Sequence, residues 1–228
     1  MDQVITQTIA SQLEDRRGAL QNAIAQIGKA PDLVRLLGDV DQALARLGTD
    51  AFGKCVVAHL SAIVRRTLDE AVSVARLIAT VNRHLNERSP ESHFVTLVAG
   101  RANRSGRVEI CNAGHCQPIV LRRSESFSLN SSGLPVGIID SSDQQTSVLQ
   151  LDVGDSLILH TDGISEAFDS AGNQYGAAAL NQTAFANRDM SPAPLAAACL
   201  DHLLRFQSTA PQLDDLTLLV LQRILKST

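Results

Sequence analysis

Carboxylates stand at two points where an apolar strand is expected to end or begin. Asp162 ends the run Ser-Leu-Ile-Leu-His-Thr-Asp and precedes Gly163, and the pair Asp214 and Asp215 precedes the run Leu-Thr-Leu-Leu-Val-Leu. Carboxylate oxygens are the ligands that hard divalent cations such as Mg²⁺ and Mn²⁺ prefer. Each position also has a purely structural interpretation, because Asp-Gly is a common turn dipeptide and Asp often caps an element. The two positions are therefore candidate metal ligands, with turn residues as the alternative.

Two further acids lie nearer the start of the chain. Asp50 precedes an apolar helix pattern, and Gly48 just before it can end the preceding helix, so Asp50 is either a helix N-cap or a third ligand. The neighbours of Asp39 repeat at helical spacing, which favours a solvated helix face; Asp39 is the weaker metal candidate.

Other catalytic signatures are missing or incomplete. The segment Cys111–Cys116 reads Cys-Asn-Ala-Gly-His-Cys, which has no standard structural zinc spacing and no second cysteine-rich half. The sequence does not exclude a Ser-His-Asp catalytic triad. However, the chain has no Gly-x-Ser-x-Gly nucleophile elbow and no Walker-type phosphate loop.

Composition excludes several classes of protein. The 228 residues carry 20 Lys and Arg against 24 Asp and Glu, a net charge of −4, which argues against a nucleic-acid binder. Six Phe, one Tyr and no Trp make a base-stacking platform improbable. We expect no membrane span, since no run of about 18 apolar residues occurs. No signal peptide is visible, so four reduced cysteines in a cytoplasmic protein are expected.

The elements that must position these residues change type along the chain. Apolar spacing predicts helices through residues 1–88, including one over 33–47 and one over 73–88 with Ser73 as its N-cap. After Pro90 short apolar runs between turn residues predict an antiparallel sheet stack, with a hairpin turn at 103–106. A helix over 192–206, with Leu195, Ala198, Cys199 and Leu203 on one face, and a final apolar strand complete the pattern. The fold class is thus α+β, divided into a helical segment 1–49 and a domain 50–228.

Five segments of the strand-rich part occur in the order found in a known family. They are HFVTLVAGR, ICNAGHCQPIVL, SSGLPVGI, GDSLILHTDGISEAFDSAGNQYG and DDLTLLVLQR. They resemble, in turn, the F-x-T-L strand, N-A-G-H-x-P-x-L, G-x-P-L-G, G-D-x-L-L-L-Y-T-D-G-V-T-E-A with G-x-x-[FY]-G, and D-D-x-T-L-L-V-L-R. These are motifs of the PPM-type, SpoIIE-like bacterial serine phosphatases, which are relatives of protein phosphatase 2C.

The resemblance implies an αββα sandwich of two antiparallel sheets with a dinuclear Mn²⁺ or Mg²⁺ site at one edge. It places Asp162, Gly163 and Asp214 at the metal site, with Asp50 as a further ligand, and implies that helices at 55–68 and 73–88 cover one sheet. The implied function is hydrolysis of phosphoserine or phosphothreonine by a metal-activated water, with no covalent intermediate. The implied substrate is a phosphorylated anti-sigma-factor antagonist.

The family's first motifs are not intact. The segment Asp50–Lys54 resembles a remnant of D-V-x-G-K-G in which Cys55 replaces a glycine, and no G-G-D-x-Y-D precedes it; residues 38–41 are the nearest candidate. Residues 21–51 weakly resemble the helical entry of a GAF sensor domain. The alternatives are therefore a catalytically silent phosphatase-fold regulator that binds a partner protein, or a truncated GAF–phosphatase descendant whose N-terminal helices form a homodimer.

Overall fold

The computed structural model describes residues 34–37, 73–88, 94–103, 105–139 and 144–224. The chain divides into two compact units, Met1–Val34 and Arg35–Thr228. Every described residue except Val34 belongs to the second unit, and that unit contains the elements that carry the candidate site.

Two four-stranded sheets form the centre of this unit. One has the strand order β1-β2-β3-β6 and the other β5-β4-β7-β8, and the pairs β2–β3, β3–β6, β4–β5, β4–β7 and β7–β8 are antiparallel. The strand bounds are β1 Val34–Leu37, β2 Leu97–Ala102, β3 Arg107–Ala113, β4 Ile119–Leu121, β5 Ser126–Ser128, β6 Ser147–Gln150, β7 Ser156–His160 and β8 Leu218–Gln222. The predicted hairpin is confirmed, since β2 pairs with β3 and the left-handed residue Gly106 (φ 87°) lies in the turn between them.

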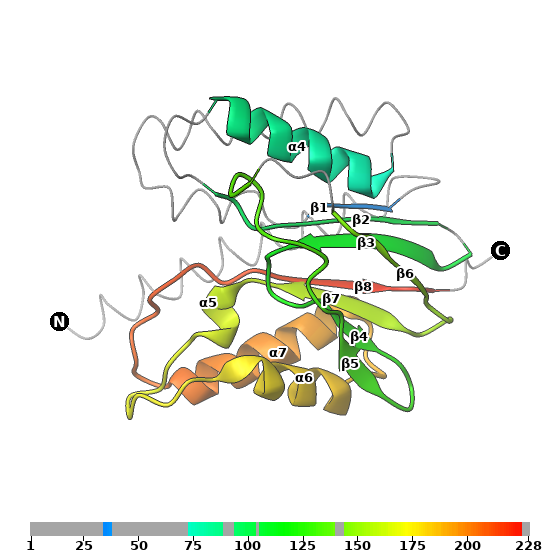
Figure 1. Cartoon of the computed structure of the whole chain (residues 1–228). Coiled ribbons are helices and arrows are strands. Elements are labelled where there is room, and N and C mark those ends of the chain that lie inside the picture. Colours follow the sequence, from blue (N-terminus) through cyan, green and yellow to red (C-terminus); the bar gives the residue numbers. More distant parts are fainter. Residues whose placement is uncertain (1–33, 38–72, 89–93, 104, 140–143, 225–228) are drawn as a thin grey trace. The chain divides into compact units, whose positions relative to one another are not determined.

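Helix α4 (Val74–Arg88) covers the first sheet (Figure 1). Its apolar side chains repeat every three or four residues, and the buried ones pack with residues of β2 and β3 in one core cluster that includes Ile78, Leu97 and Cys111. The hydroxyl of Ser73 accepts a hydrogen bond from the backbone N–H of Arg76 at 3.3 Å, so the predicted N-cap is confirmed.

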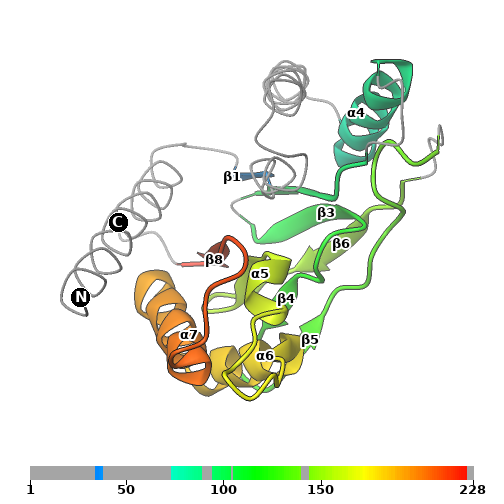
Figure 2. The same cartoon turned by 90° about the vertical axis from the view of Figure 1, so that its left-hand side faces the viewer.

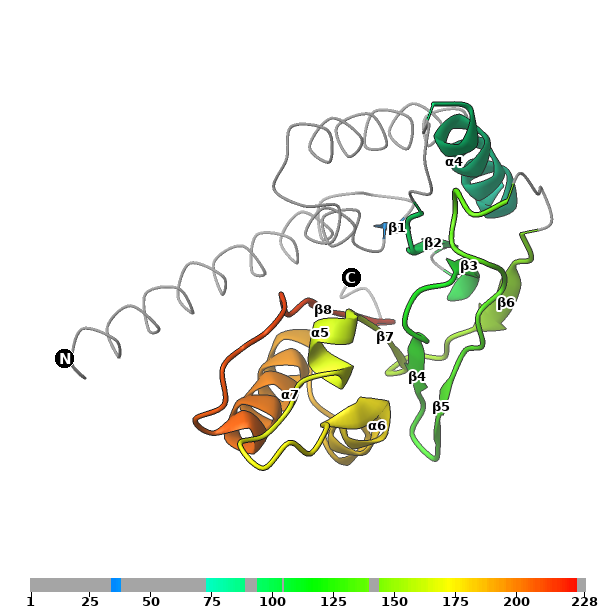
Figure 3. The ribbon, with the colours of Figure 1, turned by 60° about the vertical axis from the view of Figure 1, so that its left-hand side comes forward.

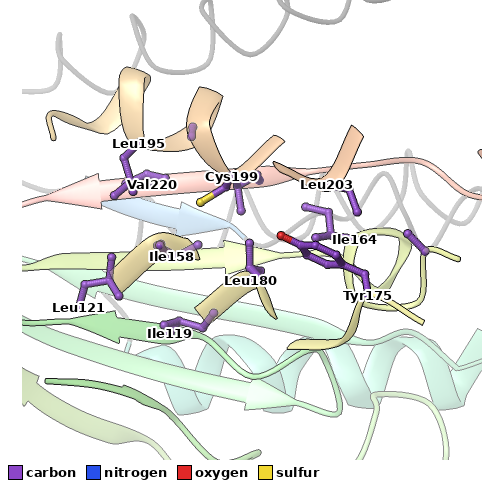
Figure 4. Close-up of a cluster of buried hydrophobic side chains, with 14 residues drawn as sticks. Ile119, Leu121, Ile158, Ile164, Tyr175, Leu180, Leu195, Cys199, Leu203 and Val220 are labelled. Atoms are coloured by element: carbon purple, nitrogen blue, oxygen red, sulfur yellow. The ribbon is translucent and has the colours of Figure 1, made fainter. Parts of the chain in front are cut away.

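The second sheet is covered on its outer face by α6 (Gly176–Ala186) and α7 (Pro192–Gln207), as Figure 2 shows from the side. Their buried side chains meet those of β4, β7 and β8 in a second cluster around Ile158, Leu180 and Leu195 (Figure 4). Side chains alternate along a strand, so neighbours of these residues, such as Leu157 and Leu159, face the other sheet and are also buried. The order of layers is helix, sheet, sheet, helix, which confirms the predicted αββα sandwich.

The structure corrects three details of the predicted elements. Residues 34–37 form strand β1 instead of part of a helix, because an apolar run this short fits either period. Helix α6 was not predicted, since its alanine-rich sequence has no continuous apolar stripe and buries mainly Leu180 and Ala184. On α7 the buried alanine is Ala196 and not Ala198.

Other predictions fall on residues that the structure does not describe: the remaining helices within 1–72, Asp39, Asp50 and the cover helix at 55–68. Within the described ranges, no helix is both long enough and apolar enough to cross a bilayer.

Candidate functional site

The carboxylate of Asp162 is set at the end of a completely buried strand. All five residues of β7 are buried, and Thr161, which follows them, keeps an extended backbone (φ −95°, ψ 161°) as the N-cap of the short helix α5 (Asp162–Ser165). Asp162 is the first helical residue and is partly exposed. The change from strand to helix therefore sets α5, which begins with Asp162, at one end of the second sheet (Figure 3).

Thr161 joins this turn to the segment that leads into β8. Its backbone N–H donates to the carbonyl of Thr217 at 3.1 Å, and its buried hydroxyl accepts from the N–H of Thr217 at 3.0 Å. The same hydroxyl donates to the carbonyl of Asp215 at 3.3 Å. These contacts continue the β7–β8 pairing, which ends at His160 and Leu218, and hold the Asp214-Asp215 pair beside the start of α5.

Gly163 permits an even closer approach of the two segments. A Cβ atom built on Gly163 would overlap the carbonyl oxygen of Asp215 and would lie 3.4 Å from the Cβ of Asp214. The backbone conformation of Gly163 does not itself require glycine, so the requirement is one of space. Sequence analysis placed Asp162, Gly163 and Asp214 in one site, and the structure brings these three residues together.

The two acids before β8 differ in their surroundings. Asp214 is half-buried, and its Oδ1 accepts a hydrogen bond from the N–H of Asp215 at 2.8 Å, while the amide of Gln212 donates to its carbonyl at 2.8 Å. Asp215 is exposed. Of the two side chains, that of Asp214 is the one whose Cβ lies within 4 Å of the Cβ position of Gly163 in α5.

Beneath Asp162 lies a buried histidine. His160 is 3% exposed, and its Nδ1 lies 3.2 Å from the carbonyl of Thr161. Burial lowers the pKa of His160, while the backbones of Thr161 and Gln117 and the carboxylate of Asp162 oppose that shift. The imidazole therefore favours the neutral form in the folded protein.

A hydrogen-bonded turn follows β3 and leads toward β4. The side chain of Asn112 is buried; its carbonyl oxygen accepts from the N–H of His115 at 2.8 Å, and its amide donates to the carbonyls of His115 and Cys116 at 3.1 and 3.3 Å. Gly114 is left-handed (φ 71°), and a Cβ there would collide with the ring of Pro135. Sequence analysis weighed this turn as a zinc site and identified it as the N-A-G-H-x-P-x-L motif, but it did not predict that Asn112 braces the turn.

The two cysteines that flank this turn differ in their burial. Cys111 is fully buried under α4, and burial raises its pKa to about 11, so its thiol packs as an apolar group. Cys116 is partly exposed.

The described residues bring the candidate cation ligands together. Asp162, Gly163 and Asp214 lie at one end of the second sheet, and carboxylate and backbone carbonyl oxygens are donors that fit Mg²⁺ or Mn²⁺. Within the described ranges no group of three or more His, Cys, Asp or Glu side chains is arranged to hold a metal. The further ligands expected from the sequence, Asp50 and the weaker candidate Asp39, lie outside those ranges.

Comparison with known proteins decides the family. The family model described as stage II sporulation protein E (SpoIIE) matches residues 48–224. The chain belongs to the SpoIIE family. The motif order and the two-sheet sandwich agree with a SpoIIE-type, protein phosphatase 2C-like domain.

Individual relatives agree with this assignment. The protein IcfG of Synechocystis is 33% identical over 104 residues, which are 44% of this chain and 16% of IcfG. The RsbU and RsbW domains of Rv1364c from Mycobacterium tuberculosis superpose with a TM-score of 0.70 at 22% identity, covering 86% of this chain and 55% of that one. The SiaA-PP2C domain of Pseudomonas aeruginosa gives a TM-score of 0.66 at 16% identity over 96% of this chain and 98% of that domain.

This chain matches only part of the length of two of these relatives. The chain spans about a sixth of IcfG and about half of the Rv1364c structure. The solved structures share the fold of this SpoIIE-family chain, and the complete proteins contain more than it does.

Proposed function

We propose that this SpoIIE-family chain is a metal-dependent serine/threonine phosphatase. The observation that carries the proposal is the close contact at Gly163. There the start of α5 packs so tightly against the Asp214-Asp215 segment that residue 163 has no room for a side chain. Such an approach brings Asp162, at the start of α5, and Asp214, in the segment before β8, to the same end of the second sheet. An Asp-Gly turn with only a structural role would not require Asp214 beside it.

Asp162 and Asp214 would hold the cations, with Asp50 as the further ligand that the resemblance implies. When bound, Mn²⁺ or Mg²⁺ supplies a water of lowered pKa and neutralises phosphoryl charge. The chain's own part is positioning: Thr161 ties the two carboxylate segments together, and the neutral, buried His160 adds no fixed positive charge beneath Asp162.

For the substrate, we propose a phosphorylated signalling protein of the anti-sigma-factor antagonist type. The RsbU and RsbW domains joined in the Rv1364c structure support this choice, since that relative couples the same fold to a second signalling domain. A substrate of this kind lies in the cytoplasm, so the proposal places the chain there.

The second candidate is a catalytically silent regulator that binds a phosphoprotein or an active relative. The observation that favours it is the incomplete first motif of the sequence, in which Cys55 replaces a glycine and no G-G-D-x-Y-D precedes Asp50. The two candidates differ in whether Mn²⁺ binds and whether turnover depends on it.

Calorimetric titration of the purified chain with Mn²⁺, followed by a phosphopeptide turnover assay, separates them. Micromolar binding and turnover that are both lost in Asp162→Asn and Asp214→Asn support the enzyme. Asp215→Asn is the matched control, because its exposed side chain lies next to Asp214 and is expected to leave both unchanged. Absence of binding at millimolar Mn²⁺ would favour the silent regulator.

A further inference from the structure

We propose that Leu213 binds the polypeptide that flanks the phosphoserine of a substrate protein, through contact with an apolar side chain beside that phosphoserine. The inference deepens the proposed phosphatase function and rests on it. Leu213 directly precedes Asp214, so its Cα lies about 3.8 Å from the Cα of a candidate metal ligand.

The side chain of Leu213 does not pack against the described part of the protein. It is 77% exposed, the largest value among the exposed large apolar side chains of the described residues. Leu216, three residues further on, instead packs against the core cluster under α7. Burial of apolar surface is the main favourable contribution to folding, so Leu213 adds little to the stability of the described fold.

The backbone around Leu213 is held in place although its side chain is exposed. The side-chain amide of Gln212 donates to the carbonyl of Asp214 at 2.8 Å, a hydrogen bond that spans Leu213. On the other side, the hydroxyl of Thr161 donates to the carbonyl of Asp215 at 3.3 Å. A side chain on a backbone fixed in this way costs little ordering entropy when it binds a ligand.

The segment that carries Leu213 runs past α5 (Figures 1 and 3). The Cβ of Asp214 lies 3.4 Å from the Cβ position of Gly163, the residue after Asp162 in α5. Leu213 therefore lies at the end of the second sheet where both candidate carboxylates lie. When a phosphoserine is bound at these carboxylates, the chain on either side of it passes over the residues next to them. The occupant of the surface around Leu213 is therefore the substrate polypeptide.

The chemistry of this surface favours an apolar side chain in that polypeptide. Leucine has no charge and no hydrogen-bonding group, and contact with an apolar side chain removes apolar area of both partners from water. Asp215, two residues along, is exposed, and its carboxylate repels an acidic residue placed nearby. The preferred substrates would carry an apolar residue, and not an acidic one, close to the phosphoserine.

The test compares wild type with Leu213→Ser, on the full chain with Mn²⁺ and two phosphoserine peptides. One peptide has leucine at the two positions before and the two positions after the phosphoserine, and the other has serine at all four. We expect the wild type to prefer the leucine peptide by about five- to tenfold in KM, the effect of partly burying one leucine. In Leu213→Ser this preference is expected to disappear, with kcat unchanged.

Three controls separate binding of the peptide from damage to the site. The small substrate p-nitrophenyl phosphate has no flanking chain, so its KM and kcat should be the same in wild type and Leu213→Ser. Val153→Ser removes another exposed apolar side chain, in the turn before β7 and thus at the other end of that strand from Asp162; it should keep the preference. Leu213→Met, which stays apolar, should keep most of it.

Other outcomes overturn one proposal or the other. A wild type without preference, or an equal preference in Leu213→Ser, overturns the role of Leu213; the phosphatase is kept if Asp162→Asn abolishes turnover. Loss of p-nitrophenyl phosphate turnover or of Mn²⁺ affinity in Leu213→Ser would show that Leu213 shapes the site itself, and would also overturn its role in binding the peptide.

Failure of the phosphatase proposal is recognised separately. If the wild type turns over neither peptide nor p-nitrophenyl phosphate, the phosphatase is overturned, and calorimetric binding of the leucine peptide decides the role of Leu213. Weaker binding in Leu213→Ser keeps that role, and equal or absent binding overturns it. If Leu213→Ser fails to fold, Leu213→Gln gives the same comparison.

Discussion

Gly163 and Asp215 are packed so closely that the carbonyl oxygen of Asp215 occupies the place of a side chain at Gly163. The contact joins two segments about fifty residues apart in sequence and brings Asp162 and Asp214 to one sheet edge. The candidate site therefore depends on a steric relationship as much as on its carboxylates.

Gly163→Ala should separate the two segments. The added methyl group has only backbone to displace, and overpacking of this kind costs about 1–3 kcal/mol of unfolding free energy. We expect a lower unfolding temperature and at least tenfold weaker Mn²⁺ binding. Gly172→Ala is the control: nothing lies within 4 Å of its Cβ position, but its φ of 83° strains any side chain. It should lower stability and leave Mn²⁺ affinity unchanged; equal Mn²⁺ affinity in both variants would contradict the steric role of Gly163.

Thr161→Val should remove the hydroxyl that links α5 to β8. Valine has nearly the same shape, so the loss is the hydrogen bonds to Thr217 and Asp215. The half-buried backbone N–H of Thr217 then loses its acceptor, and we expect a loss of about 1 kcal/mol of unfolding free energy, measured by denaturant unfolding. Thr161→Ser keeps the hydroxyl and is expected to retain most of that stability. A valine variant as stable as the serine variant would show that the hydroxyl of Thr161 does not hold α5 against the segment before β8.

Asn82→Ala should release the loop that follows β5 from α4. The buried amide of Asn82 donates to the carbonyl of Ile139 at 2.9 Å, and its oxygen accepts from the N–H of Gly137 at 2.8 Å. We expect faster hydrogen exchange at Gly137 and a loss of about 2 kcal/mol for two buried hydrogen bonds. Arg83→Ala, which removes an exposed side chain next to Asn82 on the same helix, is the control. Slow exchange at Gly137 in Asn82→Ala would argue that the loop is held by packing around Val136 instead.

The lowered pKa of His160 predicts acid destabilisation of the metal-free protein. Above pH 6.5, the ordinary histidine value, both folded and unfolded forms are neutral and the pH has no effect through this residue. As the pH falls below 6.5 the unfolded chain takes up a proton that the folded chain does not, so stability decreases until the lower folded pKa is reached. Chemical unfolding from pH 7.5 to 5 measures this slope.

His160→Tyr restores the residue of the family motif, and His160→Gln removes the charge with a smaller side chain. Both should show a shallower loss of stability between pH 6.5 and 5 than the wild type. A wild-type curve no steeper than these variants would mean that His160 titrates normally in the folded protein.

The extent to which sequence predicted the fold varies from element to element. Strongly patterned segments were predictable, because α4 carries an apolar face with a Ser73 cap and β7 is an uninterrupted apolar run between turns. Strand β1 was wrongly predicted as helix, since four apolar residues fit both periods and only pairing within a sheet selects one. Helix α6 was missed because alanine contributes little to an apolar pattern.

For the site, the sequence alone determined the candidate carboxylates Asp162 and Asp214, the glycine between strand and helix, and a motif order that implies one family. Those follow from residue type and local spacing. Only the tertiary structure decided that Gly163 meets Asp215, that Thr161 bonds to the segment before β8, and that the imidazole of His115 contacts Thr96. Each of these relationships joins segments that no local periodicity connects, because sheet register and the packing of two sheets determine them.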